Sequence, residues 1–131
     1  MWKTWFCNNK LNNLLFSGKL NKNQLKDTYN KTEFYFKPSI FEGFGCALCE
    51  AMLCECIPIG SSVNIIPKII GGNGLILEKR KIEDLKSLVK SIIKIENKNT
   101  LRKQARNHIV KKYNINNRVE KIISLIESNN L

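Results

Sequence analysis

Two glutamates bracket a glycine-rich turn in the most informative segment of the chain, Pro38-Ser-Ile-Phe-Glu-Gly-Phe-Gly-Cys-Ala-Leu-Cys-Glu50. It follows an aromatic segment, 34–36, that is typical of a strand and ends before a proline. It leads into a largely apolar segment, 46–55, for which we expect a helix. A strand, a glycine turn and a helix in this order form the unit from which nucleotide-binding α/β domains are built.

The chemistry of this stretch points to a phosphate-bearing ligand. Glu42 follows the strand, so we expect it at the carboxyl edge of the sheet, where open α/β folds bind ligands. Gly43 and Gly45 are expected to adopt positive φ angles and to let a ligand approach the backbone. A helix beginning at Cys46 favours a phosphate at its N-terminus, and Glu50 on its second turn can reach a hydroxyl of the same ligand. The pattern suits a sugar joined to a nucleotide through a diphosphate, although Glu-Gly-x-Gly alone is also common by chance.

Hydrophobic periodicity extends the same alternation of elements over the rest of the chain. We expect strands at 14–17, 34–36, 57–59 and 75–77, and helices at 21–30, 46–55, 64–70, 82–93, 100–112 and 115–126. Strands that alternate with helices predict an α/β fold, a Rossmann-like parallel sheet with helices on both faces. We expect residues 14–131 to form this domain and residues 1–13 an irregular N-terminal remnant that contains Trp2, Trp5 and Phe6.

Length and composition are those of one globular domain. The chain has 131 residues, of which 43% are hydrophobic, so it can bury a core. No apolar run approaches the roughly 20 residues that span a bilayer, and the start of the chain does not resemble a signal peptide. We therefore expect a cytoplasmic protein, with peripheral contact to a membrane left open.

The net charge of +11 suits phosphate-bearing partners such as nucleotides, nucleic acid or anionic lipid. Of the 22 cations, however, 18 are lysines scattered along the chain. A solvated lysine surface explains the same charge without any ligand.

The central stretch resembles the signature of glycosyltransferase family 4, a glutamate, seven residues and a second glutamate within Pro-Ser…Glu-Gly-Phe-Gly…Glu-Ala-Met. The resemblance implies the C-terminal, donor-binding half of a retaining enzyme with the GT-B fold. By this resemblance Glu42 is the catalytic residue and contacts hydroxyls of the transferred sugar, while Glu50 contacts the ribose. The amides of Gly43, Phe44, Gly45 and Cys46 would hold the diphosphate of a UDP- or GDP-sugar. Such enzymes need no bound metal to activate the donor.

This sequence also departs from the family pattern. The family's Arg and Lys that hold the diphosphate belong to a strand and loop not seen before Leu14, and the N-terminal acceptor half is missing. Glu55 stands where a glycine is common, and Lys68 where a glutamate often follows Pro67. The resemblance therefore implies a truncated or split enzyme with a separate acceptor-domain chain. An inactive remnant is one alternative. A basic nucleic-acid-binding module is another, which we do not favour because the aromatic residues lie mostly in the apolar segments.

The five cysteines are expected to be reduced, because their count is odd and four of them crowd into eleven residues. Those four are Cys46, Cys49, Cys54 and Cys56. Four thiolates could bind zinc, but three of these fall on one helix, where cysteine is an ordinary small core residue. We therefore expect no metal.

Three further expectations concern the last two helices. His108, the only histidine, should be exposed to solvent rather than act as a catalytic base. Four cations, Arg102, Arg106, Lys111 and Lys112, should form a solvated helix face. An apolar stripe should remain partly uncovered and cause self-association; it comprises Ile115, Val119, Ile122, Ile123 and Ile126.

Overall fold

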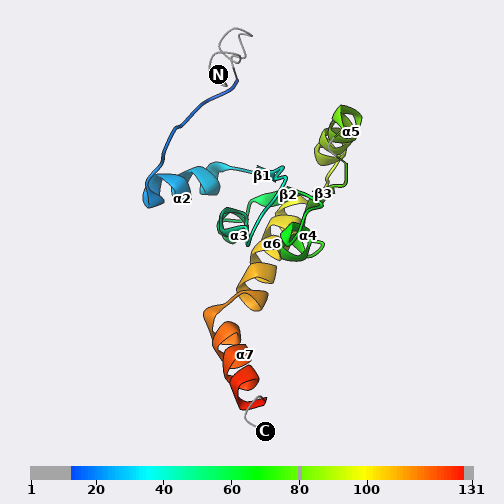
Figure 1. Ribbon diagram of the computed structural model, residues 1–131. Coiled ribbons are helices and arrows are strands. Elements are labelled where there is room, and N and C mark those ends of the chain that lie inside the picture. The colour runs from blue at the N-terminus through cyan, green and yellow to red at the C-terminus, as the bar shows by residue number, and fades with distance from the viewer. Residues whose placement is uncertain (1–12, 80, 129–131) are drawn as a thin grey trace.

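The computed structural model describes residues 13–79 and 81–128. Its centre is a three-stranded parallel sheet in the order β1-β2-β3 (Figure 1), formed by β1 (Phe34–Lys37), β2 (Ile57–Ser61) and β3 (Leu75–Leu77). Phe34 pairs with Ile57 across the first ladder, and Ile59 pairs with Leu75 across the second. Every residue of β2 is buried, as expected for the central strand of a parallel sheet covered by helices. The α/β fold class predicted from the sequence is confirmed.

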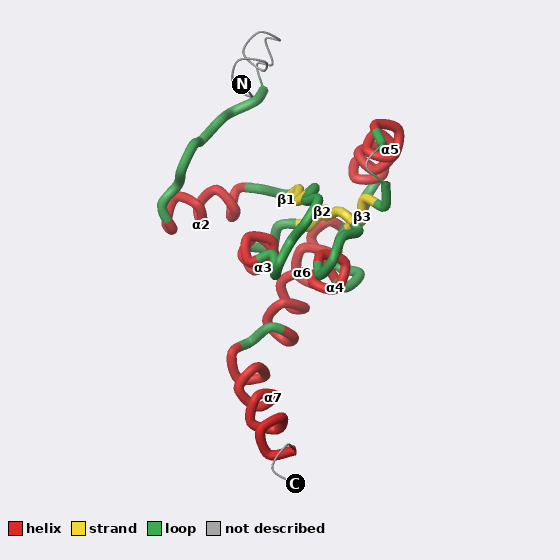
Figure 2. The backbone as a smooth tube through the Cα atoms, viewed as in Figure 1, coloured by secondary structure: helices red, strands yellow, loops and turns green. Residues whose placement is uncertain are grey.

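Helices flank the sheet, and the last helix extends away from it toward the C-terminus of the chain (Figure 2). They are α2 (Lys22–Lys31), α3 (Cys46–Leu53), α4 (Ile66–Ile70), α5 (Ile82–Ile93), α6 (Lys98–Lys112) and α7 (Ile115–Ser128). The start of α2 shows how local sequence sets a boundary. The Asn21 side chain accepts a bond from the Gln24 amide, and the Gln24 side chain accepts one from the Asn21 amide, which is a capping box.

The core lies where α3, α4 and α6 meet the sheet, and these three helices gather on one side of it in Figure 1. Its buried cluster consists of Leu48, Cys49, Met52, Ile66, Ile69, Ile70, Ala105 and Ile109. Packing here is close enough to require glycine at position 60. A Cβ atom on Gly60 would lie 2.3 Å from Cγ2 of Ile66, so α4 can approach β2 only because that side chain is absent.

The strand predicted at 14–17 is wrong. The structure has no strand in this segment, which runs away from the sheet toward the N-terminus (Figure 1). Leu14 and Leu15 are exposed at 44% and 87%. An apolar run becomes a strand only if a neighbouring strand takes up its backbone hydrogen bonds, and the sheet begins at β1. Trp2, Trp5 and Phe6 lie outside the described residues.

Both arginines of α6 contact the backbone near the end of α3, although Arg106 is exposed as predicted and only Arg102 is half-buried. Nε of Arg102 donates to the Glu55 carbonyl at 2.9 Å, and the guanidinium of Arg106 donates to the Leu53 carbonyl. Leu53 is the last residue of α3 and Glu55 lies two residues beyond it, near the helix end where carbonyls lack a partner within the helix. Lys111 is exposed, as expected.

His108 is also not exposed as predicted. Its imidazole packs against the backbone of Gly71, where an added Cβ would lie 2.4 Å from Cε1. Nε2 is buried and has no hydrogen-bond partner among the described residues. The ring lies 6.3 Å from the Tyr113 ring, so His108 fills the junction of α4 and α6.

The apolar stripe of α7 is uncovered, as predicted. Its side chains range from 48% to 70% exposed and comprise Ile115, Val119, Ile122, Ile123 and Ile126. Four apolar residues of α5 are exposed as well, namely Ile82, Leu85, Val89 and Ile93. Over the described ranges, no helix is long and apolar enough to cross a membrane.

Candidate functional site

The loop that follows β1 is hydrogen-bonded to the last residue of β2 and to the loop after it, at the carboxyl edge of the sheet. The Ser61 hydroxyl donates to the Ser39 carbonyl at 2.6 Å, and Nδ2 of Asn64 donates to the Glu42 carbonyl at 3.1 Å. Asn64 adopts a left-handed φ of +46°, which asparagine tolerates better than most residues. These bonds hold the predicted motif at the edge where open α/β folds bind ligands.

The Glu42 carboxylate lies within this loop and is engaged by it. Oε2 lies 2.9 Å from Nζ of Lys37 and accepts a bond from the Ser39 hydroxyl at 3.3 Å. The hydrogen bond from Lys37 is the largest cause that lowers the pKa of Glu42 below its ordinary value, and a bond from the Gly45 backbone contributes in the same direction. The same pair raises the pKa of Lys37. Glu42 is therefore held as a carboxylate at the entry to α3.

Of the two glycines predicted to have positive φ, only Gly45 does. It is the N-cap of α3, with φ +82° and ψ +43°. An added Cβ would lie 3.3 Å from Cδ1 of Ile69 and 3.6 Å from Cγ of Glu42. The prediction for Gly43 is wrong, because its φ is not positive. An added Cβ there would meet nothing within 4 Å, so backbone access remains open at that position.

Gly45 and Cys46 lie at the N-terminus of α3, the position predicted for the diphosphate. The Leu48 and Cys49 amides donate to the Gly45 carbonyl, so the amides that precede them are the ones left without a partner within the helix. Phe44 is half-exposed, with its ring 5.9 Å from that of Tyr113. The sequence-predicted residues 42–46 thus lie together at one end of α3.

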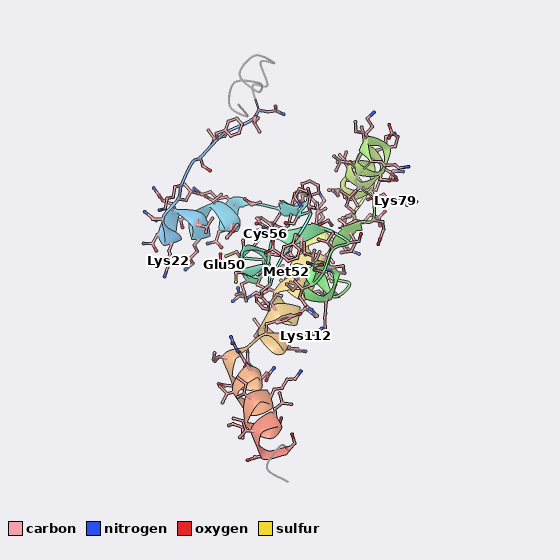
Figure 3. The ribbon with its side chains drawn as sticks, in the orientation of Figure 1. Lys22, Glu50, Met52, Cys56, Lys79 and Lys112 are labelled. Atoms are coloured by element: carbon pink, nitrogen blue, oxygen red, sulfur yellow. The ribbon has the colours of Figure 1, made fainter. Side chains whose placement is uncertain are left out.

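Glu50 is exposed on the side of α3 that faces α2 (Figure 3). It lines a cavity of about 420 Å³ between the two helices. Lys22 and Lys26 of α2 line the same cavity, together with Tyr29. The structure therefore adds two cations to the surroundings of Glu50. It shows no contact between Glu50 and Glu42.

Of the three cysteines expected as core residues of one helix, Cys49 is buried, Cys54 is half-buried and Cys46 is exposed, so the expectation is wrong for Cys46. Cys49 and Cys56 are buried, and Cys46 is exposed at the start of α3. Burial is the largest cause that raises the pKa of both buried thiols to about 11. Sγ of Cys56 donates to the Tyr29 carbonyl at 3.2 Å. Within 13–79 and 81–128, no group of three or more His, Cys, Asp or Glu side chains is placed to hold a metal ion.

Sequence reasoning did not single out Lys37 or Asn64. Lys37 is the last residue of β1 and therefore lies at the same edge of the sheet as Glu42, whose carboxylate its Nζ contacts. A cation at the end of a strand, five residues before the motif glutamate, is the signal that could have revealed it. No comparable signal identifies Asn64, because its contact crosses 22 residues of sequence.

Comparisons with known proteins concern the family and the fold of the chain. The family profile described as "Glycosyl transferases group 1" matches residues 7–112. The serotype-specific mannosyltransferase WbdA of Escherichia coli is 29% identical over 80 residues, which cover 61% of this chain and 10% of that protein. The chain thus spans about a tenth of the length of this curated relative. Sucrose-phosphate synthase from Thermosynechococcus elongatus superposes with a TM-score of 0.78 at 20% identity, covering 97% of this chain and 33% of that one. This structural likeness shows the fold of one half of a GT-B glycosyltransferase.

Proposed function

The chain belongs to the glycosyl transferases group 1 family, and we propose that it is the donor half of a retaining hexosyltransferase of family 4, binding a UDP- or GDP-sugar. The observation that carries the proposal is the meeting of Glu42, the left-handed Gly45 and the start of α3 at the carboxyl edge of the sheet. A carboxylate beside unpaired helix amides can bind sugar hydroxyls and a phosphate of the same ligand.

Glu42 and Glu50 have separate roles in this proposal. Glu42, the catalytic residue, contacts hydroxyls of the transferred sugar, and the amides of Gly43 to Cys46 contact the diphosphate. Glu50 accepts hydrogen bonds from the ribose on the side of α3 that faces α2. The exposure of Glu50 supports its availability to a ligand.

In this proposal Lys37 supplies a cation to the diphosphate. Its Nζ is held 2.9 Å from Glu42, and its side chain is partly exposed at 27%. When a diphosphate binds, Lys37 exchanges part of its contact with Glu42 for a phosphate oxygen. The carboxylate is then available to the sugar. No metal takes part in this scheme, because helix amides and a lysine provide the positive potential.

The acceptor half belongs to a separate chain in this proposal. The exposed stripe of α7 supports an interface with such a chain, since exposed apolar patches of this kind mark partner surfaces. We place the protein in the cytoplasm, with peripheral membrane contact where the acceptor requires it. Sedimentation of the isolated chain should show self-association; a stable monomer that transfers sugar by itself would contradict the split-enzyme proposal.

NMR titration of the chain with UDP- and GDP-sugars tests donor binding. We expect saturable shifts at millimolar concentration that chelators do not alter. Glu50→Gln should weaken binding by about 1–3 kcal/mol, because it removes the charge from a hydrogen-bonded acceptor. The matched control is Glu120→Gln on α7, which changes the same charge on another exposed helix. Shifts with polynucleotide but with neither sugar nucleotide would refute the proposal, and equal affinity of Glu50→Gln and wild type would remove Glu50 from the site.

A further inference from the structure

A second cavity, of about 730 Å³, lies at the corner between the motif loop and the junction of α6 with α7. Its wall contains two aromatic rings, Phe44 and Tyr113, which meet edge to face at 5.9 Å. The Tyr113 hydroxyl donates to the Lys68 carbonyl at 3.3 Å, which ties this wall to α4. Phe44 is 49% exposed, so part of its ring is open to a ligand.

The corner is held by its own hydrogen bonds. The Tyr113 amide donates to the Ile109 carbonyl at 2.9 Å and ends α6. The Asn117 amide donates to Oδ1 of Asn114 at 3.0 Å, which caps the first turn of α7. Nδ2 of Asn117 donates back to the Lys111 carbonyl at 2.6 Å. The two helices therefore keep a defined angle at the cavity, and a site there needs little rearrangement to bind a ligand.

Three cations line this cavity, and its lining within the described part of the chain includes no carboxylate. They are Lys112 at the end of α6 and, one helical turn apart on α7, Arg118 and Lys121. None of the three forms an ion pair with another described residue. Nζ of Lys112 lies 5.8 Å from the centre of the Tyr113 ring. Cations that converge without a counter-charge favour an anion, and an arginine among them favours phosphate in particular.

We propose that this corner pocket binds a phosphate group carried on a ring, as in a sugar phosphate or a nucleoside monophosphate. Arg118 and Lys121 bind the phosphate, with Lys112 beside it, and the face of the ring packs against Phe44 and Tyr113. The volume falls within the range of about 300–1,000 Å³ that is usual for small-molecule pockets. Glu50 lines a different cavity, so this site is independent of the proposed donor site except for the shared neighbourhood of Phe44.

Binding of glucose 6-phosphate, UMP and inorganic phosphate to the whole chain, measured by NMR titration, tests the proposal. We expect at least one of the two ring-bearing phosphates to bind several-fold more tightly than inorganic phosphate, and unphosphorylated glucose to cause no shifts. The two ring-bearing probes distinguish a sugar phosphate from a nucleotide as the ligand. Equal affinity for inorganic phosphate and both ring-bearing phosphates would overturn the role given to the aromatic wall.

The variant Arg118→Gln/Lys121→Gln should weaken binding by about tenfold or more, since it removes two charge-assisted contacts. Lys86→Gln/Lys90→Gln on α5 is the matched control: it also removes two exposed cations from one helix face and should leave binding unchanged. Equal weakening by both double variants would attribute binding to the overall positive charge and overturn the proposal. Both variants alter exposed positions, and circular dichroism confirms that each is folded.

Glu50→Gln separates the two sites. It should weaken binding of UDP- or GDP-sugars while leaving glucose 6-phosphate, which carries no ribose, bound at the corner as in the wild type. A wild-type chain that binds glucose 6-phosphate but neither UDP- nor GDP-sugars would therefore count against the proposed donor function and leave the corner site standing. Absence of saturable shifts with glucose 6-phosphate and UMP would refute the corner site.

Discussion

Replacing Gly45 by alanine should destabilise the protein, whereas the same change at Gly43, two residues earlier in the motif, should not. Gly45 adopts φ +82° as the N-cap of α3. An L-residue in the left-handed region costs about 1–2 kcal/mol relative to glycine. The new Cβ would also lie 3.3 Å from Cδ1 of Ile69, a contact that the buried side chain must move to relieve.

The reduced freedom of alanine in the unfolded chain offsets about 0.4–1 kcal/mol of this cost. Adding the steric contact with Ile69, we expect Gly45→Ala to lower the free energy of unfolding by about 1–2 kcal/mol. For a domain of this size the midpoint of thermal unfolding should fall by about 3–8 °C. Gly43 has no positive φ and an open Cβ position, so Gly43→Ala should change stability by no more than about 0.5 kcal/mol.

Urea unfolding followed by circular dichroism measures both variants, with the slope of the transition as a check that unfolding remains two-state. A Gly45→Ala variant as stable as the wild type would refute the assignment of backbone strain to this position. Equal destabilisation by the two variants would show that the loop depends on glycine flexibility in general rather than on one left-handed residue.

Three more predictions follow from individual contacts. Glu55 adopts φ +63°, and its hydrogen bond from Arg102 is to the backbone carbonyl, which glycine keeps. Glu55→Gly should therefore raise the free energy of unfolding by about 0.5–1 kcal/mol. A lower free energy of unfolding in urea would contradict this. Lys37→Met should raise the pKa of Glu42 toward its ordinary value of 4.5, because the lysine bond is the largest cause of its lowering, and an unchanged carboxyl titration by NMR would exclude the pair. Since the lowered pKa of Glu42 contributes stability that is present at neutral pH and lost as pH falls through that pKa, the wild type should lose more stability than Lys37→Met on acidification. Iodoacetamide at pH 7.5 should label Cys46, which is exposed, well before Cys49, whose pKa is raised to about 11 by burial. Peptide mass mapping measures the alkylation rate of each cysteine, and equal rates for the two would contradict the burial of Cys49.

Most of the secondary structure could be predicted because its determinants are local. Asn21 was predicted to cap α2, and it does so through Gln24, three residues away. The apolar spacing in 82–93 marks α5 with its observed ends. Boundaries that depend on backbone strain were less accurate: a helix was expected to continue to Glu55, but α3 ends at Leu53 and Glu55 takes a left-handed conformation.

The α/β class, the alternation of elements from residue 21 onward and the position of the glutamate-glycine motif follow from the sequence, because periodicity and turn residues act between near neighbours. Tertiary packing pairs Lys37 with Glu42 and brings Arg102 to the Glu55 carbonyl, 47 residues away. It also leaves residues 14–17 without a partner strand. These outcomes depend on which distant segments pack against each other. The charge or apolarity of a side chain does not reveal which segment it will contact. A residue type alone therefore does not determine whether a side chain is exposed to solvent, buried in the core or part of a functional site; its neighbours in the folded chain do.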